Sequence, residues 1–340
     1  MRIAALVLRR LAGMIGVLLG VSVITFVIAQ LVPTDVARLV AGDHASPAII
    51  ARVRAELGLD RPIWVQYGLY LDRLLHGDLG TSIRSGRAIS DELMERLPAT
   101  IELAFASFAL IVAAGLSLGV AAALGARRWP DHLIRTISTI AISAPTFWTG
   151  VLLLAIFFGW LDWLPPGGRI DPDLLGEPGL TGLYIVDGLI AGRLDIVGSA
   201  LQHLALPAIT LALASSGSAI RLVRASMLDV LQEDYVRRAR AAGLSEATVV
   251  LRYALPSALV PFVTAMALYL ADLLAGAVVT EIIFGWPGLG SYTLEAIAGL
   301  DFPAIMGFTL LAAVFYTIAN QLVDLIYGLL DPRLRPGART

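Results

Sequence analysis

The stretch PATIELAFASFALIVAAGLSLGVAAALGARR, residues 98–128, decides the fold of this chain of 340 residues. It holds no charged residue between Leu103 and Ala126, and it ends in the pair Arg127 and Arg128. A helix needs about 20 apolar residues to cross the hydrocarbon core of a bilayer. Arginines are typical of the place where such a helix leaves the membrane. The stretch therefore predicts a transmembrane helix.

The same pattern recurs along the chain, which is 57% hydrophobic and only 15% charged. Soluble domains carry about 25% charged residues. The other apolar runs lie at residues 11–32, 137–164, 204–220, 256–283 and 304–330. Three of these runs contain a proline (Pro145, Pro207 and Pro261), which membrane helices tolerate because neighbouring groups satisfy the freed carbonyls. The sequence predicts an all-α polytopic membrane protein with six transmembrane helices.

The runs divide the chain into expected parts. Residues 1–32 form the N-terminal tail and first transmembrane helix, 33–97 an outer-side segment, 98–330 the core transmembrane domain, and 331–340 a cytoplasmic tail. The first run exceeds the apolar core of about 7–15 residues in a secretory signal peptide and lacks a clear cleavage site. We expect it to be a retained helix.

The outer-side segment carries signals of folded structure. Ser46 followed by Pro47 predicts the start of a short helix over 48–57, and Gly58 is suited to end it in left-handed geometry. The segment is either a cap on the outer face or a docking surface for an extracellular partner. The residues favour neither.

Arginine placement predicts the orientation, because short cytoplasmic loops are enriched in basic residues. The short loops on one side hold only Arg169 and Arg193, and the first outer segment is too long for the rule to apply. The other side is rich in arginine, at Arg2, Arg9, Arg10, Arg127, Arg128, Arg135, Arg221, Arg224, Arg237, Arg238, Arg240, Arg252, Arg333, Arg335 and Arg339. We expect both termini and the loop between the fourth and fifth spans to be cytoplasmic.

Missing residue types exclude several kinds of site. The chain has no cysteine, which excludes disulfides and thiolate metal sites. All 25 basic residues are arginine, and a nucleotide-binding P-loop requires lysine. The four histidines are dispersed, so we expect no metal site. If ATP drives this protein, a partner must bind the nucleotide.

The loop MLDVLQEDYVRRARAAGLSEATVVLRYALP, residues 227–256, is the most informative polar stretch. In a helix over 234–242, Tyr235, Ala239 and Ala242 share one face and Arg237 and Arg240 another. Small residues allow the backbone of a partner to approach closely. The residues alone leave open whether this is a partner-binding helix or a surface helix that merely connects two spans.

Several ionisable or polar residues lie in or near the apolar runs: Glu102, Asp272, Glu281, Asn320 and Asp324. A charge near the bilayer centre costs about 2.5–3.5 kcal/mol on insertion scales, so such groups face a bundle interior or a wet cavity. For Glu102, Glu281 and Asp324 we favour structural contacts over a substrate path. Asp272 lies deepest in its run and is the candidate for the translocation path.

The segment EDYVRRARAAGL, residues 233–244, resembles the cytoplasmic coupling loop of bacterial ABC import permeases, in the form found in B-type subunits of dipeptide, oligopeptide and nickel systems. Other motifs match that family in the same order: GDLGTS (77–82), RLPAT (96–100), WLP (163–165), FGWPGLG (284–290) and LDPR (330–333). The chain departs from the general loop motif at Arg237 to Ala239, as the peptide branch does. It also departs from that branch at Tyr253 and Pro256.

This resemblance implies a type I importer fold in the bacterial inner membrane. A second, C-type permease, two ATPase subunits carrying ATP and Mg²⁺, and an extracytoplasmic binding protein would complete the complex. The chain itself would bind lipid but neither a cofactor nor nucleic acid. The resemblance implies that 227–256 is a coupling loop whose ATPase contacts are Asp234, Tyr235, Arg237, Arg238, Ala239, Ala242, Gly243 and Leu244.

Two other classes of protein compete with this interpretation. A secondary transporter would show inverted repeats with paired broken helices, and none is evident. An intramembrane enzyme would carry a motif such as His-Glu-x-x-His or Gly-x-Ser-x-Gly, and neither occurs. The sequence does not identify the substrate among dipeptides, longer peptides, nickel chelates, glutathione and opines.

Overall fold

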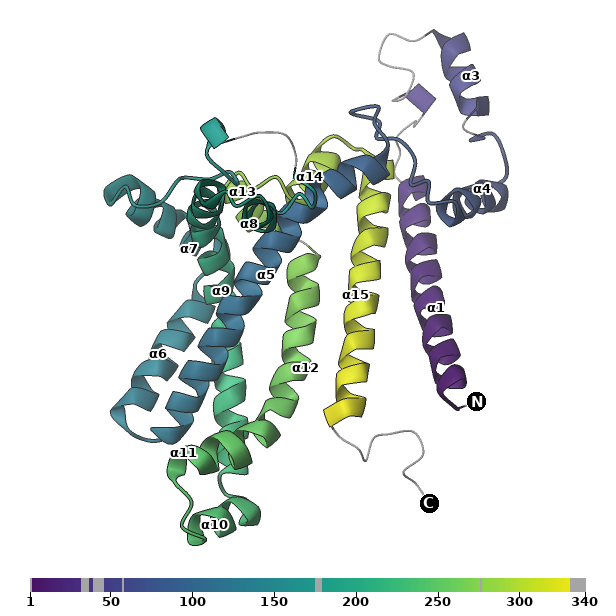
Figure 1. The fold of residues 1–340 in the computed structure, drawn as a ribbon. Helices are drawn as coiled ribbons and strands as arrows, with labels where there is room; N and C mark the ends of the chain where they lie inside the picture. Colours follow the sequence, from purple (N-terminus) through teal and green to yellow (C-terminus); the bar gives the residue numbers. More distant parts are fainter. Residues whose placement is uncertain are drawn as a thin grey trace. The chain divides into compact units, whose positions relative to one another are not determined.

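The computed structural model describes residues 2–31, 37–38, 46–56, 58–174, 179–275 and 277–330. Within these ranges the chain is helical apart from loops and one antiparallel bridge between Thr81 and Ala88 (Figure 1). In chain order the helices are α1 (Arg2–Leu31), α3 (Pro47–Glu56), α4 (Ile63–Leu75), α5 (Ile89–Leu124), α6 (Trp129–Ser143), α7 (Thr146–Leu154), η1 (Ala155–Trp160), η2 (Pro172–Leu174), α8 (Tyr184–Ile190), α9 (Leu194–Val230), α10 (Asp234–Ala241), α11 (Glu246–Thr248), η3 (Val249–Ala254), α12 (Leu255–Leu274), α13 (Val278–Ile283), α14 (Leu289–Ala298) and α15 (Phe302–Leu330).

Six crossings agree with this structure. Five helical stretches in the described part are long and apolar enough to span a bilayer, and a bent pair of helices brings the number to six when it is counted as one span. The five are Ala12–Leu31, Ile89–Leu124, Leu194–Val230, Glu246–Leu274 and Phe302–Gln321. The prediction of an all-α polytopic protein is confirmed. Several helices extend beyond the apolar runs, because more polar turns at their ends are helical as well.

The third span is not the continuous helix predicted over 137–164. It consists of α6 and the pair α7–η1, which meet at an angle of 102°. Ala144 has extended backbone geometry (φ −77°, ψ 129°), and Pro145 starts the next helix. A proline clashes with helical geometry at the residue before it, so the helix ends there. Pro207, by contrast, lies inside the unbroken helix α9.

The fifth span also differs from its predicted range of 256–283. It begins ten residues earlier, at Glu246, and its helix ends at Leu274. The residues from Val278 to Ile283 form the separate helix α13. Between the two helices, Ala277 has non-helical backbone geometry (φ −89°, ψ 60°) and precedes α13 as its N-cap.

The chain divides into two compact units. One comprises residues 1–97 and 292–317, and the other comprises 98–291 and 318–340. Three helices contribute to both units, the long helices α5 and α15 and the shorter α14. The domain boundaries expected from the sequence stay predictions.

In the second unit α9 is the central helix, and it contacts α6, α7, α8, α12 and α13. Helix α5 approaches α9 through two glycines spaced four residues apart, Gly115 and Gly119. A Cβ at Gly119 would lie 2.6 Å from Cβ of Val223, and one at Gly115 would lie 3.0 Å from Ala219. Small residues at this spacing let two membrane helices pack backbone to backbone.

A largely buried ion pair joins α6 to α9. Asp131 is 1% exposed, and its two carboxylate oxygens accept hydrogen bonds from Nε and a terminal nitrogen of Arg224 at 2.6 and 2.7 Å. The Arg127 N–H donates to the same carboxylate at 3.0 Å. This bidentate ion pair connects the first turn of α6 to the later part of α9.

The first unit confirms the helix signals of the outer segment. Helix α3 begins at Pro47, and the Ser46 hydroxyl accepts a hydrogen bond from the Ile49 N–H at 3.4 Å. Gly58 adopts φ +68°, as expected for the residue that closes the helix. Where the loop after α4 meets the start of α15, the Ser82 hydroxyl donates to Asp301 at 2.6 Å.

Candidate functional site

The predicted loop between the fourth and fifth spans contains a short helix, α10, between α9 and α11 (Figure 1). Its first turn holds Asp234, and its last turn holds Arg238 and Arg240. Negative charge therefore lies at the positive end of the helix dipole and positive charge at the negative end. This order stabilises a helix that is too short to persist by propensity alone.

Gly243 closes α10 with a backbone conformation that other residues rarely adopt, φ +80°. The Gly243 N–H donates to the Arg240 carbonyl at 3.0 Å, and the Leu244 N–H donates to the Ala239 carbonyl at 3.4 Å. These two hydrogen bonds form a Schellman motif, which needs a left-handed residue at this place. A Cβ at Gly243 would meet no atom within 4 Å, so backbone conformation alone favours glycine here.

The inner face of α10 packs against the rest of its own chain. Val236, Ala239 and Val249 form a small buried cluster with exposures of 0%, 6% and 0%. The Tyr235 hydroxyl donates a hydrogen bond to the Ser257 hydroxyl on α12 at 3.0 Å. These contacts fix α10 to η3 and to α12.

The structure separates residues that the sequence placed on one face. Ala239 is buried against this chain, whereas Tyr235 and Ala242 are exposed. Ala239 therefore supports α10 from beneath. Val236 was missed by the sequence analysis, although its spacing of three residues from Ala239 in an otherwise polar helix is the signal of a buried stripe.

The remaining predicted contact residues form one exposed surface, which we call the α10 surface. It comprises Asp234, Tyr235, Arg237, Arg238, Ala242, Gly243 and Leu244. Arg237 lies 3.8 Å from the Asp234 carboxylate, and Arg238 donates to the Asp234 carbonyl at 3.3 Å. Exposed ion pairs of this kind contribute little to stability. The two guanidinium groups stay accessible to an acidic partner.

A second ion pair holds the loop together after α10. Two nitrogens of Arg240 donate to the two carboxylate oxygens of Glu246 at 3.1 and 2.7 Å. These hydrogen bonds raise the pKa of Arg240. The Ser245 hydroxyl accepts from the Thr248 N–H at 3.3 Å and caps α11. The turn between α10 and α11 is therefore well defined.

Helices α11, η3 and α12 form one continuous candidate span from Glu246 to Leu274. The π-helical turn η3 lies directly beneath α10, because Val249 belongs to both η3 and the buried cluster. π-helical turns are frequent at functional positions. A movement of α10 would therefore be transmitted through a few packed side chains to the span that contains α12.

Glu281 is a completely buried carboxylate with structural partners in its own unit. The Thr100 hydroxyl donates to one carboxylate oxygen at 3.0 Å, and the Ser291 N–H donates to the other at 2.8 Å. The Thr100 hydroxyl oxygen also accepts a hydrogen bond from the Leu289 N–H at 2.8 Å. The network holds the segment between α13 and α14, together with the first residues of α14, against α5 at Thr100, in agreement with the structural interpretation of Glu281.

Glu102 is likewise bound within its unit. Its carboxylate accepts from Arg169 at 2.7 Å and from the Ile185 N–H at 3.0 Å. Arg169 also lies over the ring of Tyr184, with its guanidinium carbon 4.5 Å from the ring centroid. The buried pair therefore anchors the loop before α8 to α5.

The candidate path residue Asp272 lies on an exposed part of α12, and its role stays a prediction. Asn320 is exposed on α15, and the side chain of Asp324 lies outside the described residues. Among the residues that the structure describes, no group of three or more histidine or acidic side chains could hold a metal ion.

Comparison with known families gives two matches that together cover most of the chain. Residues 115–336 match the family described as binding-protein-dependent transport system inner membrane component. Residues 3–104 match the N-terminal part of the membrane component of binding-protein-dependent transport systems.

Individual relatives match over nearly the whole length. A probable D,D-dipeptide transport system permease of Escherichia coli K12 is 47% identical, over 97% of this chain and 97% of the relative. A dipeptide transport system permease of Alkalihalophilus pseudofirmus is 39% identical over 97% and 99%. A glutathione transport system permease of Salmonella paratyphi A is 39% identical over 97% and 98%. A solved structure of the MetNI methionine ABC transporter in inward-facing conformations gives a TM-score of 0.49 at 17% identity, covering 69% of this chain and 95% of that chain.

Proposed function

Since the chain belongs to the family of binding-protein-dependent transport system inner membrane components, we propose that it forms one half of a peptide import channel. Family membership makes it a multi-pass inner-membrane permease of an ABC importer, a transport subunit rather than an enzyme. Such a subunit works with an ATPase and a binding protein. The proposal adds the substrate class, the composition of the complex and the coupling contact.

The α10 surface carries the proposal. It is an exposed, basic surface on a helix whose opposite face is packed onto the start of a membrane span. We assign it to a groove of a partner ATPase, where Arg237 and Arg238 meet acidic side chains and Tyr235, Ala242 and Leu244 supply apolar contact. Gly243 sets the end of the helix, and Ala239 supports it from within.

Two ATPase subunits would bind ATP and Mg²⁺ and close on each other during the cycle. The closure would displace α10, and the contacts of Val236 with Val249 and of Tyr235 with Ser257 would pass that movement to α12. A second, C-type permease would supply the other half of the channel in a type I arrangement. Arginine placement favours a cytoplasmic location for α10 and for both termini.

Peptides are the substrate class best supported by the relatives, two of which are dipeptide systems by name. Asp272 is the candidate residue for the translocation path, because it is a carboxylate in the membrane span that α10 would move. The binding protein would select the peptide and deliver it from the outer side.

The test is a charge reversal on the α10 surface in the assembled transporter. Arg237→Glu with Arg238→Glu should lower ATPase co-purification and abolish uptake of a labelled dipeptide. Arg61→Glu changes an exposed arginine outside the α10 surface and should leave both unchanged. Normal ATPase association and uptake in the double variant would refute the contact. Uptake by this chain alone without ATP would refute the whole proposal.

A further inference from the structure

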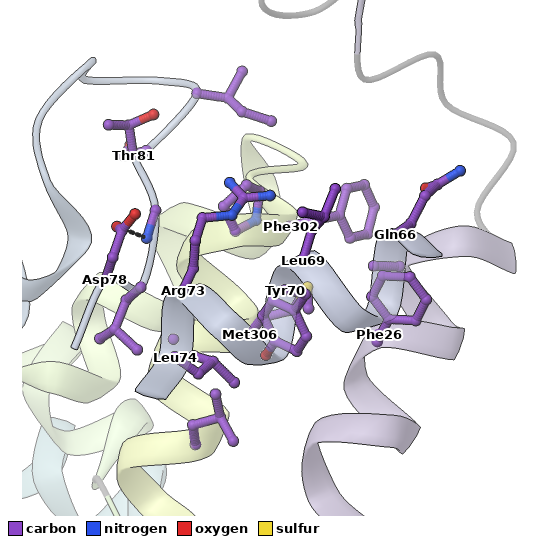
Figure 2. Close-up of a pocket in the computed structure, with 18 of the residues that line it drawn as sticks. Phe26, Gln66, Leu69, Tyr70, Arg73, Leu74, Asp78, Thr81, Phe302 and Met306 are labelled. Carbon is purple, nitrogen blue, oxygen red and sulfur yellow. Dashed lines mark hydrogen bonds between the residues drawn. The ribbon is translucent and has the colours of Figure 1, made fainter. Parts of the chain in front are cut away.

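A pocket of about 400 Å³ lies between α1, α4 and the start of α15, beside the loop that follows α4 (Figure 2). Its volume is within the range of small-molecule sites. All of its lining residues belong to the compact unit formed by residues 1–97 and 292–317. The coupling loop takes no part in it.

The pocket lies at the ends of two membrane spans. Helix α1 contributes Phe26 and Gln30 from its last turns, and α15 contributes Phe302 to Leu310 from its first turns. With a rise of 1.5 Å per residue, the latter segment reaches about 12 Å along the helix from its end. We take Phe302, the first residue of a candidate span, as the bilayer surface. With a headgroup region about 5–8 Å thick on each side, the inner end of the pocket then lies at the depth of acyl chains.

The third wall, α4, has the character of a helix at the membrane interface. None of its residues is buried, and its exposed residues include Trp64 at 73% and Leu75 at 85%. The Tyr67 hydroxyl and the Ser22 hydroxyl on α1 share a hydrogen bond of 2.9 Å, which holds α4 against that span. Aromatic residues are enriched where a protein meets lipid headgroups.

The lining is amphiphilic in the same sense as a lipid. Phe26, Leu69 and Met306 give an apolar part. Arg73 lines the pocket from α4, and its guanidinium has no ion-pair or hydrogen-bond partner among the described residues. The neighbouring carboxylate of Asp78 already accepts the Gly80 N–H at 2.8 Å, drawn dashed in Figure 2. Arg73 is therefore the cationic group that the pocket offers to an anionic ligand.

We propose that this pocket binds one phospholipid, with an acyl chain between α1 and α15 and the phosphate at Arg73. A water-soluble peptide would bring unpaired backbone groups to the depth of acyl chains, which is costly. A partner helix, about 10 Å wide, would fill the hollow with roughly one turn and would bring no anion to Arg73. A phospholipid satisfies both the apolar walls and the cation. The bound lipid would fix α4 against the two spans.

The experiment uses the assembled transporter, purified in detergent and stripped of lipid. It is titrated with phosphatidylglycerol and with the diacylglycerol of the same chains, and bound lipid is counted by native mass spectrometry. Arg73→Gln should weaken phosphatidylglycerol binding about fivefold, as expected for a partly exposed ion pair, and should leave diacylglycerol binding unchanged. Arg61→Gln removes a charge just before α4 outside the pocket and should change neither.

Met306→Trp tests the apolar part of the pocket, because the larger side chain would occupy the space of the acyl chain. It should remove one bound lipid of either kind, whereas Met306→Leu, which conserves volume, should retain it. Phosphatidylglycerol binding that is the same in wild type, Arg73→Gln and Met306→Trp would overturn the proposal. A complex that retains no lipid sensitive to Met306→Trp would show that a partner subunit fills the pocket, and would overturn it as well.

Discussion

The close approach of α5 to α9 at Gly119 gives the sharpest prediction about stability. An alanine Cβ there would lie 2.6 Å from Cβ and 2.8 Å from Cγ1 of Val223, and 3.1 Å from the Ile220 carbonyl oxygen. Carbon atoms in ordinary contact are about 3.5–4.0 Å apart, so the two helices must separate locally by about 1 Å. Gly119→Ala should therefore destabilise the second unit.

The magnitude follows from the cost of overpacking. Extra methyl groups in a well-packed core cost about 1–3 kcal/mol. A loss of about 2 kcal/mol corresponds to a fall in Tm of about 4–8 °C for a unit of this size. Gly198→Ala is the control, because Gly198 lies inside α9, the helix that Gly119 of α5 contacts, and a Cβ there meets nothing within 4 Å. It should not lower Tm.

The assay is the thermal unfolding of the purified complex, followed for Gly119→Ala, for Val223→Ala and for the double variant. Removing the Val223 methyl groups makes room for the new Cβ. The double variant should therefore lose less unfolding free energy than the two single variants lose together, and the difference should be about 0.5–3 kcal/mol. Strict additivity, or a Tm of Gly119→Ala equal to wild type, would refute the reasoning about helix contact.

Three further predictions concern other parts of the chain. Gly243→Ala should destabilise α10 by about 1–2 kcal/mol, because alanine must then adopt a left-handed backbone conformation. Faster amide hydrogen exchange in α10 would show this loss, and Gly243→Asn should give a smaller one. Asp131→Asn should lower the free energy of unfolding by about 3 kcal/mol. Breaking a buried ion pair costs about 3–5 kcal/mol, and the lower value applies because 20% of the Arg224 side chain is exposed. An unchanged Tm would contradict this prediction. Asp272→Asn should reduce peptide uptake with normal assembly, and unchanged uptake would remove Asp272 from the path.

Local signals in the sequence predicted local structure well. Ser46, Gly58 and Gly243 act as helix start and stop residues because caps depend on a few neighbouring backbone groups. The apolar runs predicted the candidate spans, because the length of a span depends on a local run of apolar residues. The role of Ala239 was harder to predict, because the face that it presents depends on η3, which folds under α10.

Prolines show where the sequence is insufficient. Pro145 and Pro207 both lie in apolar runs, yet one breaks its span and the other lies in a continuous helix. The difference depends on whether surrounding helices satisfy the freed carbonyls, which is a property of the packed structure. Similarly, the hydrogen bond between Thr100 and Glu281 joins residues that are far apart in the chain, and the local sequence around either residue does not predict the contact.

The bend at Pro145 also bears on how the chain enters the membrane during synthesis. Each half, Trp129–Ser143 and Thr146–Trp160, is about 22 Å long, shorter than the hydrocarbon core of about 30 Å. Neither half is a complete insertion signal for the translocon. Helix α6 packs on α9 so closely that a Cβ at Gly217 would lie 2.6 Å from the Ser138 carbonyl oxygen. We therefore expect the third crossing to reach its final position only after α9, a later-made segment, has left the ribosome.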